Sequence, residues 1–302
     1  MKKFEQGQAL VLVLLSLAVV LTLVLFILSR SITDVAISSR QEESVRAFSA
    51  AEAGIEKSLV IGAGTSLTTI GDAKYSSEVS DYSEGSQDFI YPINMASGDY
   101  ATTWFMAHDS SGNLVCDISS PCFSSDAPTD NRPFIKICWG KPGTDNDVAT
   151  TPAIEASIFY ESTPGDPTTL KISRDAYDPF TVRNAENGFS EANNEVCTIS
   201  GVSYAFQKTL TYANFGIPET SYNEQGGLQF MQTRMFYNSD QSHPIGITVD
   251  FDDNLTLPSQ GQSIVSTGTS GQSNRRLEVF QGWPEVPSVF NYAVYSSQGL
   301  TK

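Results

Sequence analysis

The sequence predicts an α+β fold, in which one long N-terminal helix packs against a mostly antiparallel, β-rich head. Two observations lead to this prediction. No proline precedes Pro92, and between Gln8 and Ile61 the only glycine is Gly54, so nothing in this stretch obliges a helix to stop. Beyond it, several short segments alternate apolar and polar residues, a pattern typical of half-buried strands.

The first part of the predicted helix is apolar from Ala9 to Leu28, with only Ser16 and Thr22 as polar residues. A bilayer core needs about 20 helical residues, whereas the apolar core of a secretory signal has about 7 to 15. No small-residue cleavage pattern follows, because the chain continues with Ser29 and Arg30. We therefore expect residues 8–28 to form a retained membrane span.

The second part, residues 29–61, is predicted to be amphipathic. Its apolar residues step by three and four, which places them on one face that would pack on the head. They are Val45, Phe48, Ala51, Ile55 and Leu59. Gly62 and Gly64 follow and predict the end of the helix, because glycine is common just past a helix C-terminus. The whole rod would be about 80 Å long.

This N-terminus resembles a type IV prepilin. More narrowly, "GQALVLVLLSLAVVLTLVLFILSRSITDV" with "RAFSAAEAGIEKSL" resembles the PilX N-terminal family of type IV pilus assembly proteins, over about 60 of the 302 residues. The resemblance implies that residues 1–7 are a basic leader, that a prepilin peptidase cuts after Gly7, and that Gln8 starts the mature chain. It also implies a cytoplasmic N-terminus, an extracytoplasmic head at residues 62–302, and other pilin subunits as partners of the helix. Charge counting alone leaves the orientation open.

Leu12 departs from the major pilins that this segment resembles. Those proteins carry a glutamate there, which pairs with a neighbouring subunit's N-terminal amine in the filament core. A carboxylate buried in hydrocarbon is costly unless paired, so its absence removes a docking contact. The PilX family and tip pseudopilins also commonly lack this glutamate, so the resemblance with Leu12 implies a minor pilin or pseudopilin-like subunit rather than the repeating one. We expect a non-enzymatic role in filament priming, tip assembly or surface adhesion.

The charge of the chain lies after the helix. The first 61 residues hold six basic and six acidic side chains, so the whole formal charge of −16 belongs to residues 62–302. Such a head repels phosphates, which argues against binding nucleic acid through a basic patch. The only adjacent basic pair in it, Arg275 and Arg276, is expected to be an ordinary exposed pair at a strand end.

All four cysteines lie in the head, an even number that predicts two disulfides with three possible connectivities. We prefer Cys116 with Cys122, because the closure is local, and Cys138 with Cys197. The cysteine and histidine spacings do not fit a zinc site. Calcium is a weak candidate at "DFDDN", through Asp250, Asp252 and Asp253, and at "DND" from Asp145 to Asp147, since neither cluster has EF-hand spacing.

Within the head, residues 62–87 are rich in Ser, Gly and Thr and predict a surface connection with at most one short element. Ile154–Tyr160 and Leu170–Ile172, separated by "STPGDPTT", predict a hairpin. Ile245–Phe251 alternates and predicts a half-buried strand. With "LQFMQTRMFY", "QSIVST" and "RRLEVF", it would complete an antiparallel meander, and "GWPEVPSVFNYAVYSS" would add an edge strand.

The sequence gives little support to an enzyme. Only His108 and His243 could serve as a histidine base, no G-x-S-x-G elbow is present, and His243 before Pro244 is expected to be a solvated turn residue. No nucleotide motif occurs, and we predict no cofactor. Two other interpretations stay open: an uncleaved, membrane-anchored surface adhesin, and an anchored hydrolase whose carboxylate pair the sequence does not identify.

Overall fold

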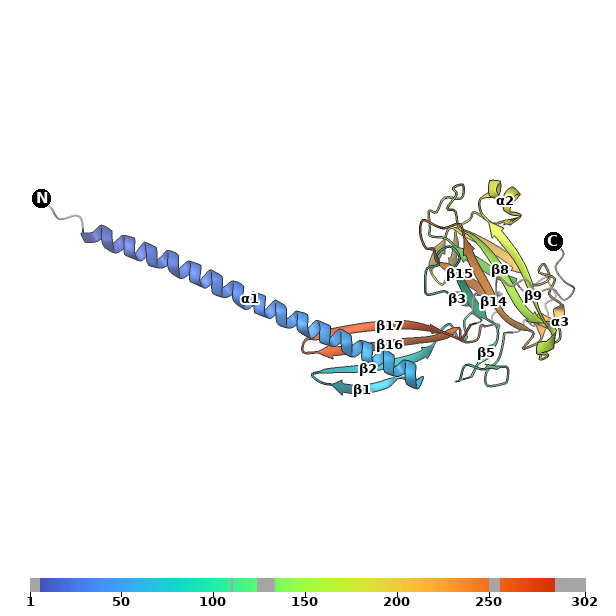
Figure 1. The fold of residues 1–302 in the computed structure, drawn as a ribbon, viewed down its shortest axis with the longest axis horizontal. Coiled ribbons are helices and arrows are strands. Elements are labelled where there is room, and N and C mark those ends of the chain that lie inside the picture. Colours follow the sequence, from blue (N-terminus) through green and yellow to red (C-terminus); the bar gives the residue numbers. More distant parts are fainter. Residues whose placement is uncertain (1–5, 110, 124–133, 250–255, 286–302) are drawn as a thin grey trace, which may run out of the picture. The chain divides into compact units, whose positions relative to one another are not determined.

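A computed structural model describes residues 6–109, 111–123, 134–249 and 256–285, with side chains from Leu10 onward (Figure 1). The chain divides into two compact units. The first joins Met1–Val79 to Ile264–Val279, and the second joins Ser80–Ser263 to Phe280–Lys302. Strands near both ends of the chain therefore share a unit with the long helix.

The first unit contains one helix and a four-stranded sheet. Helix α1 runs without interruption over Gln6–Ile61, which confirms the predicted continuous helix. The sheet has the order β1-β2-β16-β17, with β1 at Thr65–Ile70, β2 at Ala73–Asp81, β16 at Gly261–Ser270 and β17 at Ser273–Gly282. β1 and β17 are therefore the edge strands.

The prediction for residues 62–87 is wrong, because this segment forms the β1–β2 hairpin instead of a surface connection. Gly71 takes a positive φ of 57° in the turn between the two strands. Ala73, Tyr75 and Ser77 are buried at alternate positions of β2, while their neighbours are more exposed. The period of two is present, but small and hydroxylated side chains carry it, so an apolar pattern did not show it.

In its described residues, the second unit contains two larger sheets and two small hairpins. The five-stranded sheet has the order β10-β9-β8-β14-β4, and the four-stranded sheet has the order β13-β7-β15-β3. The small hairpins are β5–β6 and β11–β12. The strands are β3 (Asp88–Ile90), β4 (Tyr100–Trp104), β5 (Ala107–His108), β6 (Leu114–Val115), β7 (Phe134–Trp139), β8 (Ala153–Glu161), β9 (Leu170–Asp178), β10 (Ser190–Glu191), β11 (Cys197–Ile199), β12 (Val202–Tyr204), β13 (Phe206–Thr211), β14 (Leu228–Phe236) and β15 (Ile245–Val249); the helices are η1 (Pro167–Thr169), α2 (Thr181–Asn187) and α3 (Glu219–Asn223).

One core joins the two larger sheets. Ile158 and Met231 of the five-stranded sheet belong to the same buried cluster as Ile137 and Ile247 of the four-stranded sheet. The predicted hairpin is confirmed, because β8 and β9 pair antiparallel across the expected turn. Most other pairs are also antiparallel, although β10 pairs parallel with β9, so the α+β class is confirmed.

The predicted meander is wrong. β14 pairs with β4 and β8, β15 with β3 and β7, and β16 lies between β2 and β17, so these consecutive strands belong to three sheets. Only the β16–β17 hairpin of this meander matches the prediction, and residues 286–297 of the predicted edge strand lie outside the described residues.

β15 is buried along its whole length instead of half-buried. Ile247 faces the main core, while a side chain at Gly246 would collide with the ring of Tyr204 on the β11–β12 hairpin. That hairpin covers the second face of the sheet, which explains the burial of both faces of β15.

Candidate functional site

None of the residues that the structure describes buries the N-terminal half of α1. From Leu10 to Leu28, the large apolar side chains are exposed, and Leu12 keeps 65% of its surface exposed. The Ser16 hydroxyl donates to the Val13 carbonyl at 2.9 Å and the Thr22 hydroxyl to the Val19 carbonyl at 2.8 Å, so both polar side chains are satisfied within the helix. By length and composition, this helix could cross a membrane once.

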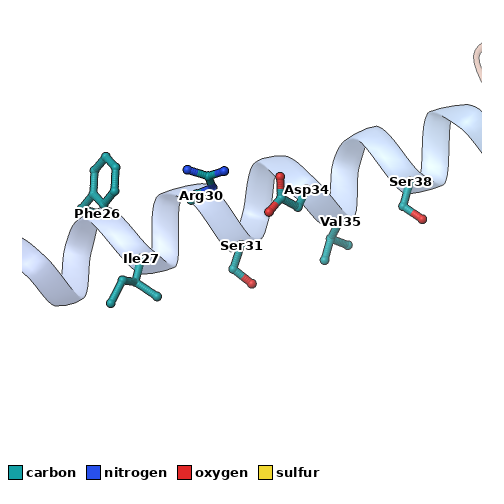
Figure 2. A pocket seen from close by; sticks show the side chains of 7 residues that line it. All are labelled: Phe26, Ile27, Arg30, Ser31, Asp34, Val35 and Ser38. Carbon is teal, nitrogen blue, oxygen red and sulfur yellow. The ribbon is translucent and has the colours of Figure 1, made fainter.

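Figure 2 shows the stretch of α1 where the apolar run ends. Phe26, Arg30 and Asp34 project to one side of the helix, and Ile27, Ser31 and Val35 project to the other. Arg30 is the first charged residue after Leu28, and Asp34 follows one turn later. Charged groups avoid the hydrocarbon core of a bilayer, so Arg30 marks the end of the segment that could lie in lipid.

The C-terminal half of α1 packs on the sheet through small residues. Ala47, Ala51 and Ser58 are fully buried, and Ala50 and Gly54 lie beside them on the same face. We call these five residues the small-residue seam. The backbone of α1 approaches β16 so closely that a Cβ at Gly268 would overlap the Ala47 carbonyl oxygen, and one at Gly54 would overlap Ser266.

The packing face predicted from the sequence is therefore only partly right. Ala51 and Ile55 are buried as expected, but Val45, Phe48 and Leu59 keep 60%, 42% and 41% of their surfaces exposed. The prediction for these three residues is wrong because the buried face of the helix is centred on the small-residue seam, and Val45, Phe48 and Leu59 lie to the side of it. The sequence signal that was missed is the recurrence of Ala, Gly and Ser at spacings of three and four from Ala47 to Ser58.

Polar contacts along the edges of the seam hold α1 on the sheet. The Glu43 carboxylate accepts from the Gln272 backbone N–H at 3.1 Å, in the turn between β16 and β17. The Ser58 and Ser77 hydroxyls lie 2.7 Å apart and are buried. On the β1 side, Arg46 pairs with Glu42 on its own helix and with Asp72 at 3.2 Å.

The predicted processing residues Gly7 and Gln8 lie in the first turn of α1, where the structure describes the backbone only. The two units differ in charge. The first unit holds 9 of the 18 basic and 9 of the 34 acidic residues, which leaves 9 and 25, a net −16, in the second. The helical unit is thus neutral as a whole, and the other unit is strongly acidic.

The preferred disulfide connectivity is confirmed. Cys116 bonds to Cys122 across a short loop, and Cys138 of β7 bonds to Cys197 of β11. The second bond ties the covering hairpin to the four-stranded sheet, where Cys138, Cys197, Ile199 and Tyr204 form a buried cluster.

The prediction that His243 is a solvated turn residue is wrong. His243 is fully buried, pairs by backbone bonds with Met95, and accepts at Nδ1 from the Lys141 backbone N–H at 3.1 Å. Burial lowers its pKa, and nearby Lys141 lowers the pKa further. His108 lies between Trp104 and Trp283, with ring centroids at 4.6 and 4.7 Å, and burial lowers its pKa to about 4.

The calcium candidates Asp250, Asp252 and Asp253 lie outside the described residues. Asp145 and Asp147 are exposed in a loop. Among the residues that the structure describes, no group of three or more His, Cys, Asp or Glu side chains is placed to hold a metal ion. No protein-family model, curated protein or solved structure matches the chain.

Proposed function

We propose that this chain is a non-enzymatic minor subunit of a type IV pilus-like filament. In this proposal, the chain is held in a membrane by the apolar half of α1 before assembly. The observation that carries it is the continuity of α1: one helix combines an apolar half that the chain leaves uncovered with a second half fixed to a sheet.

Burial of the apolar half of α1 would drive assembly. An apolar helix that the chain itself leaves uncovered is stable only in lipid or against other apolar helices. Because α1 is continuous and fixed to the sheet by the small-residue seam, transfer of its apolar half into a filament core would carry the attached sheet with it. A flexible tether would anchor a head without positioning it, whereas a rigid helix does both.

The resemblance of residues 7–59 to the PilX N-terminal family supports the same proposal, and Leu12 supports a minor or capping subunit over the repeating one. The role that we propose is priming of assembly or presentation of the acidic head at the filament tip, where it could take part in adhesion. No catalytic step is assigned to it.

The test is proteolytic processing in a cell that has a prepilin peptidase. The intact mass and N-terminal peptide of the membrane-extracted chain should show a start at Gln8, and a start at Met1 once the peptidase gene is deleted. Gly7→Arg should block the cut, whereas Gln6→Arg, which adds the same charge one residue earlier, should leave it intact. A chain that starts at Met1 in both cells would favour the uncleaved adhesin instead.

A further inference from the structure

A groove of about 420 Å³ runs beside α1 within the first unit. One wall is the flank of α1 formed by Ser44, Val45 and Phe48, and the other is β17, through Arg275, Arg276 and Leu277. This flank lies next to the small-residue seam but is not covered by the sheet. β17 is an edge strand, and no other strand within the described ranges pairs with its outer side.

The groove holds an arginine without an ionic partner. Arg275 donates from Nε and Nη2 to the Ser44 hydroxyl oxygen, at 3.1 and 2.6 Å, and no carboxylate oxygen among the described residues lies within 4.0 Å of it. Its neighbour Arg276 pairs with Glu278 at 3.3 Å. A guanidinium has five N–H donors in a planar fork that matches a carboxylate, so Arg275 keeps donors free for one.

The α1 wall of the groove is largely apolar. Val45 and Phe48 are one turn apart on α1 and keep 60% and 42% of their surfaces exposed. An exposed aromatic ring beside an unpaired guanidinium is the composition found at the centre of protein interfaces. The groove therefore suits a surface that offers one carboxylate and one apolar side chain close together.

Distance argues for a protein over a lipid. Val45 lies about 26 Å beyond Leu28 along α1, at 1.5 Å per residue. The interfacial layer of a bilayer extends only about 5 to 8 Å beyond the hydrocarbon core. A lipid headgroup around the end of the apolar run therefore does not reach the groove when the helix stands upright.

We propose that the groove docks the amphipathic half of a neighbouring pilin-type subunit's helix, whose carboxylate binds Arg275 while an apolar side chain one turn away covers Val45 and Phe48. This inference rests on the proposed function. Subunits that join through their apolar halves would run their helices side by side, and the axes of packed helices lie about 8 to 10 Å apart. The α1 helix itself offers such a face, since exposed Glu52 lies one turn after Phe48.

Photocrosslinking of the full chain in its own cell tests the docking. A benzoylphenylalanine at Phe48 keeps an aromatic ring in the groove and should give an adduct with a peptide from the helix of another subunit or of a second copy. The matched control is the same probe at Lys57, which is also exposed and lies about two and a half turns away, on the opposite side of α1. Adducts with lipid, equal adducts at both sites, or no adduct would overturn the proposal.

A charge reversal tests the role of Arg275. With the Phe48 probe in place, Arg275→Glu should lower the adduct yield at least tenfold, and Arg276→Glu, on the neighbouring residue, should change it less than twofold. Arg275→Lys keeps the positive charge but loses the planar guanidinium fork. Its adduct yield should therefore lie between those of the two charge-reversal variants. Equal melting temperatures of the three variants would exclude misfolding, and equal losses from both reversals would overturn the pairing.

The same samples separate this inference from the proposed function. Cleavage after Gly7 is measured in each by N-terminal peptide mass. Chains that are cleaved and reach the filament fraction but give no Phe48 adduct would overturn the docking site alone. Chains that are neither cleaved nor assembled would overturn the proposed function as well.

Discussion

At the scale of single residues, Gly268 sets how closely α1 approaches β16. A Cβ there would overlap the Ala47 carbonyl oxygen and the Ala51 backbone nitrogen, neither of which belongs to a movable side chain. We expect Gly268→Ala to lower the free energy of unfolding of the first unit by about 1 to 3 kcal/mol, as overpacking does. Chemical denaturation in detergent would measure it. Gly282→Ala on β17, where the nearest atom is at 3.5 Å, is the control and should have little effect.

His108 makes a second prediction, about pH. Burial holds its pKa at about 4, whereas the unfolded chain has a histidine pKa of about 6.5. Between these pH values the unfolded state binds more protons than the folded state. The stabilising contribution of neutral His108 to the free energy of unfolding is therefore complete above pH 6.5 and declines as the pH falls towards 4. His108→Phe keeps a ring between Trp104 and Trp283 but removes the proton site.

We therefore expect the melting temperature of His108→Phe to fall less than that of the unmodified chain between pH 6.5 and 4.5. Some pH dependence should remain in the variant, because burial also lowers the pKa of His243. Identical slopes in the two proteins would mean that His108 does not titrate in this range in either state.

At the scale of elements, sequence patterns predicted some features better than others. The length of α1 followed from the absence of proline and the single internal glycine, which are local constraints. The packing face of α1 could not be predicted in this way. The pattern of large apolar residues indicated Val45, Phe48 and Leu59, whereas the close approach to β16 buries Ala47 and Ala51. That approach depends on Gly268, which is remote in sequence and invisible to a local pattern.

The same reasoning separates the strands that were predicted from those that were missed. β8 and β9 carry large apolar residues in alternation and a clear turn, so they were found. β1 and β2 bury Thr65, Ala73 and Ser77, whose small side chains look like those of a loop. The pairing of the strands could not be predicted from local sequence patterns either, because β16 pairs with β2, which is far away in the chain.

The two disulfides should differ in their contribution to stability. In the chain-entropy model, a cross-link stabilises more when it closes a longer loop, and the sequence separations are 6 for Cys116–Cys122 and 59 for Cys138–Cys197. Replacing both cysteines of a pair by alanine should therefore cost about 2 kcal/mol more for the second bond than for the first. Denaturant unfolding of the two double variants would measure this difference. Equal losses would mean that loop closure does not determine the contribution.

At the scale of the whole molecule, charge and apolarity are segregated. The net charge of −16 belongs to the second unit, while the uncovered apolar surface of α1 belongs to the first, which is neutral as a whole. An acidic unit repels phosphate-rich surfaces, whereas an exposed apolar helix is stabilised by burial in lipid or against other helices. The surface that could enter an apolar phase and the surface that carries the charge therefore belong to different units.

This segregation leads to a prediction about insertion. On the biological insertion scale, the apolar residues of the span sum to about −5 to −10 kcal/mol, and each central arginine adds about 2.5 to 3.5 kcal/mol. One substitution, Leu14→Arg, should leave most of the chain in the carbonate-resistant membrane fraction. Adding Leu21→Arg, two turns away on the same face, brings the sum close to zero and should release a large part of it.

The matched control places the same two charges on α1 beyond the predicted span. Ile32→Arg with Ser39→Arg keeps the spacing of seven residues on exposed, uncharged positions, so membrane retention should be unchanged. If the Leu14 and Leu21 double variant stayed in the membrane as fully as this control, α1 would not be held by burial of its apolar half. Holding the chain would then require a protein partner before assembly, and the membrane stage of the proposed function would be wrong.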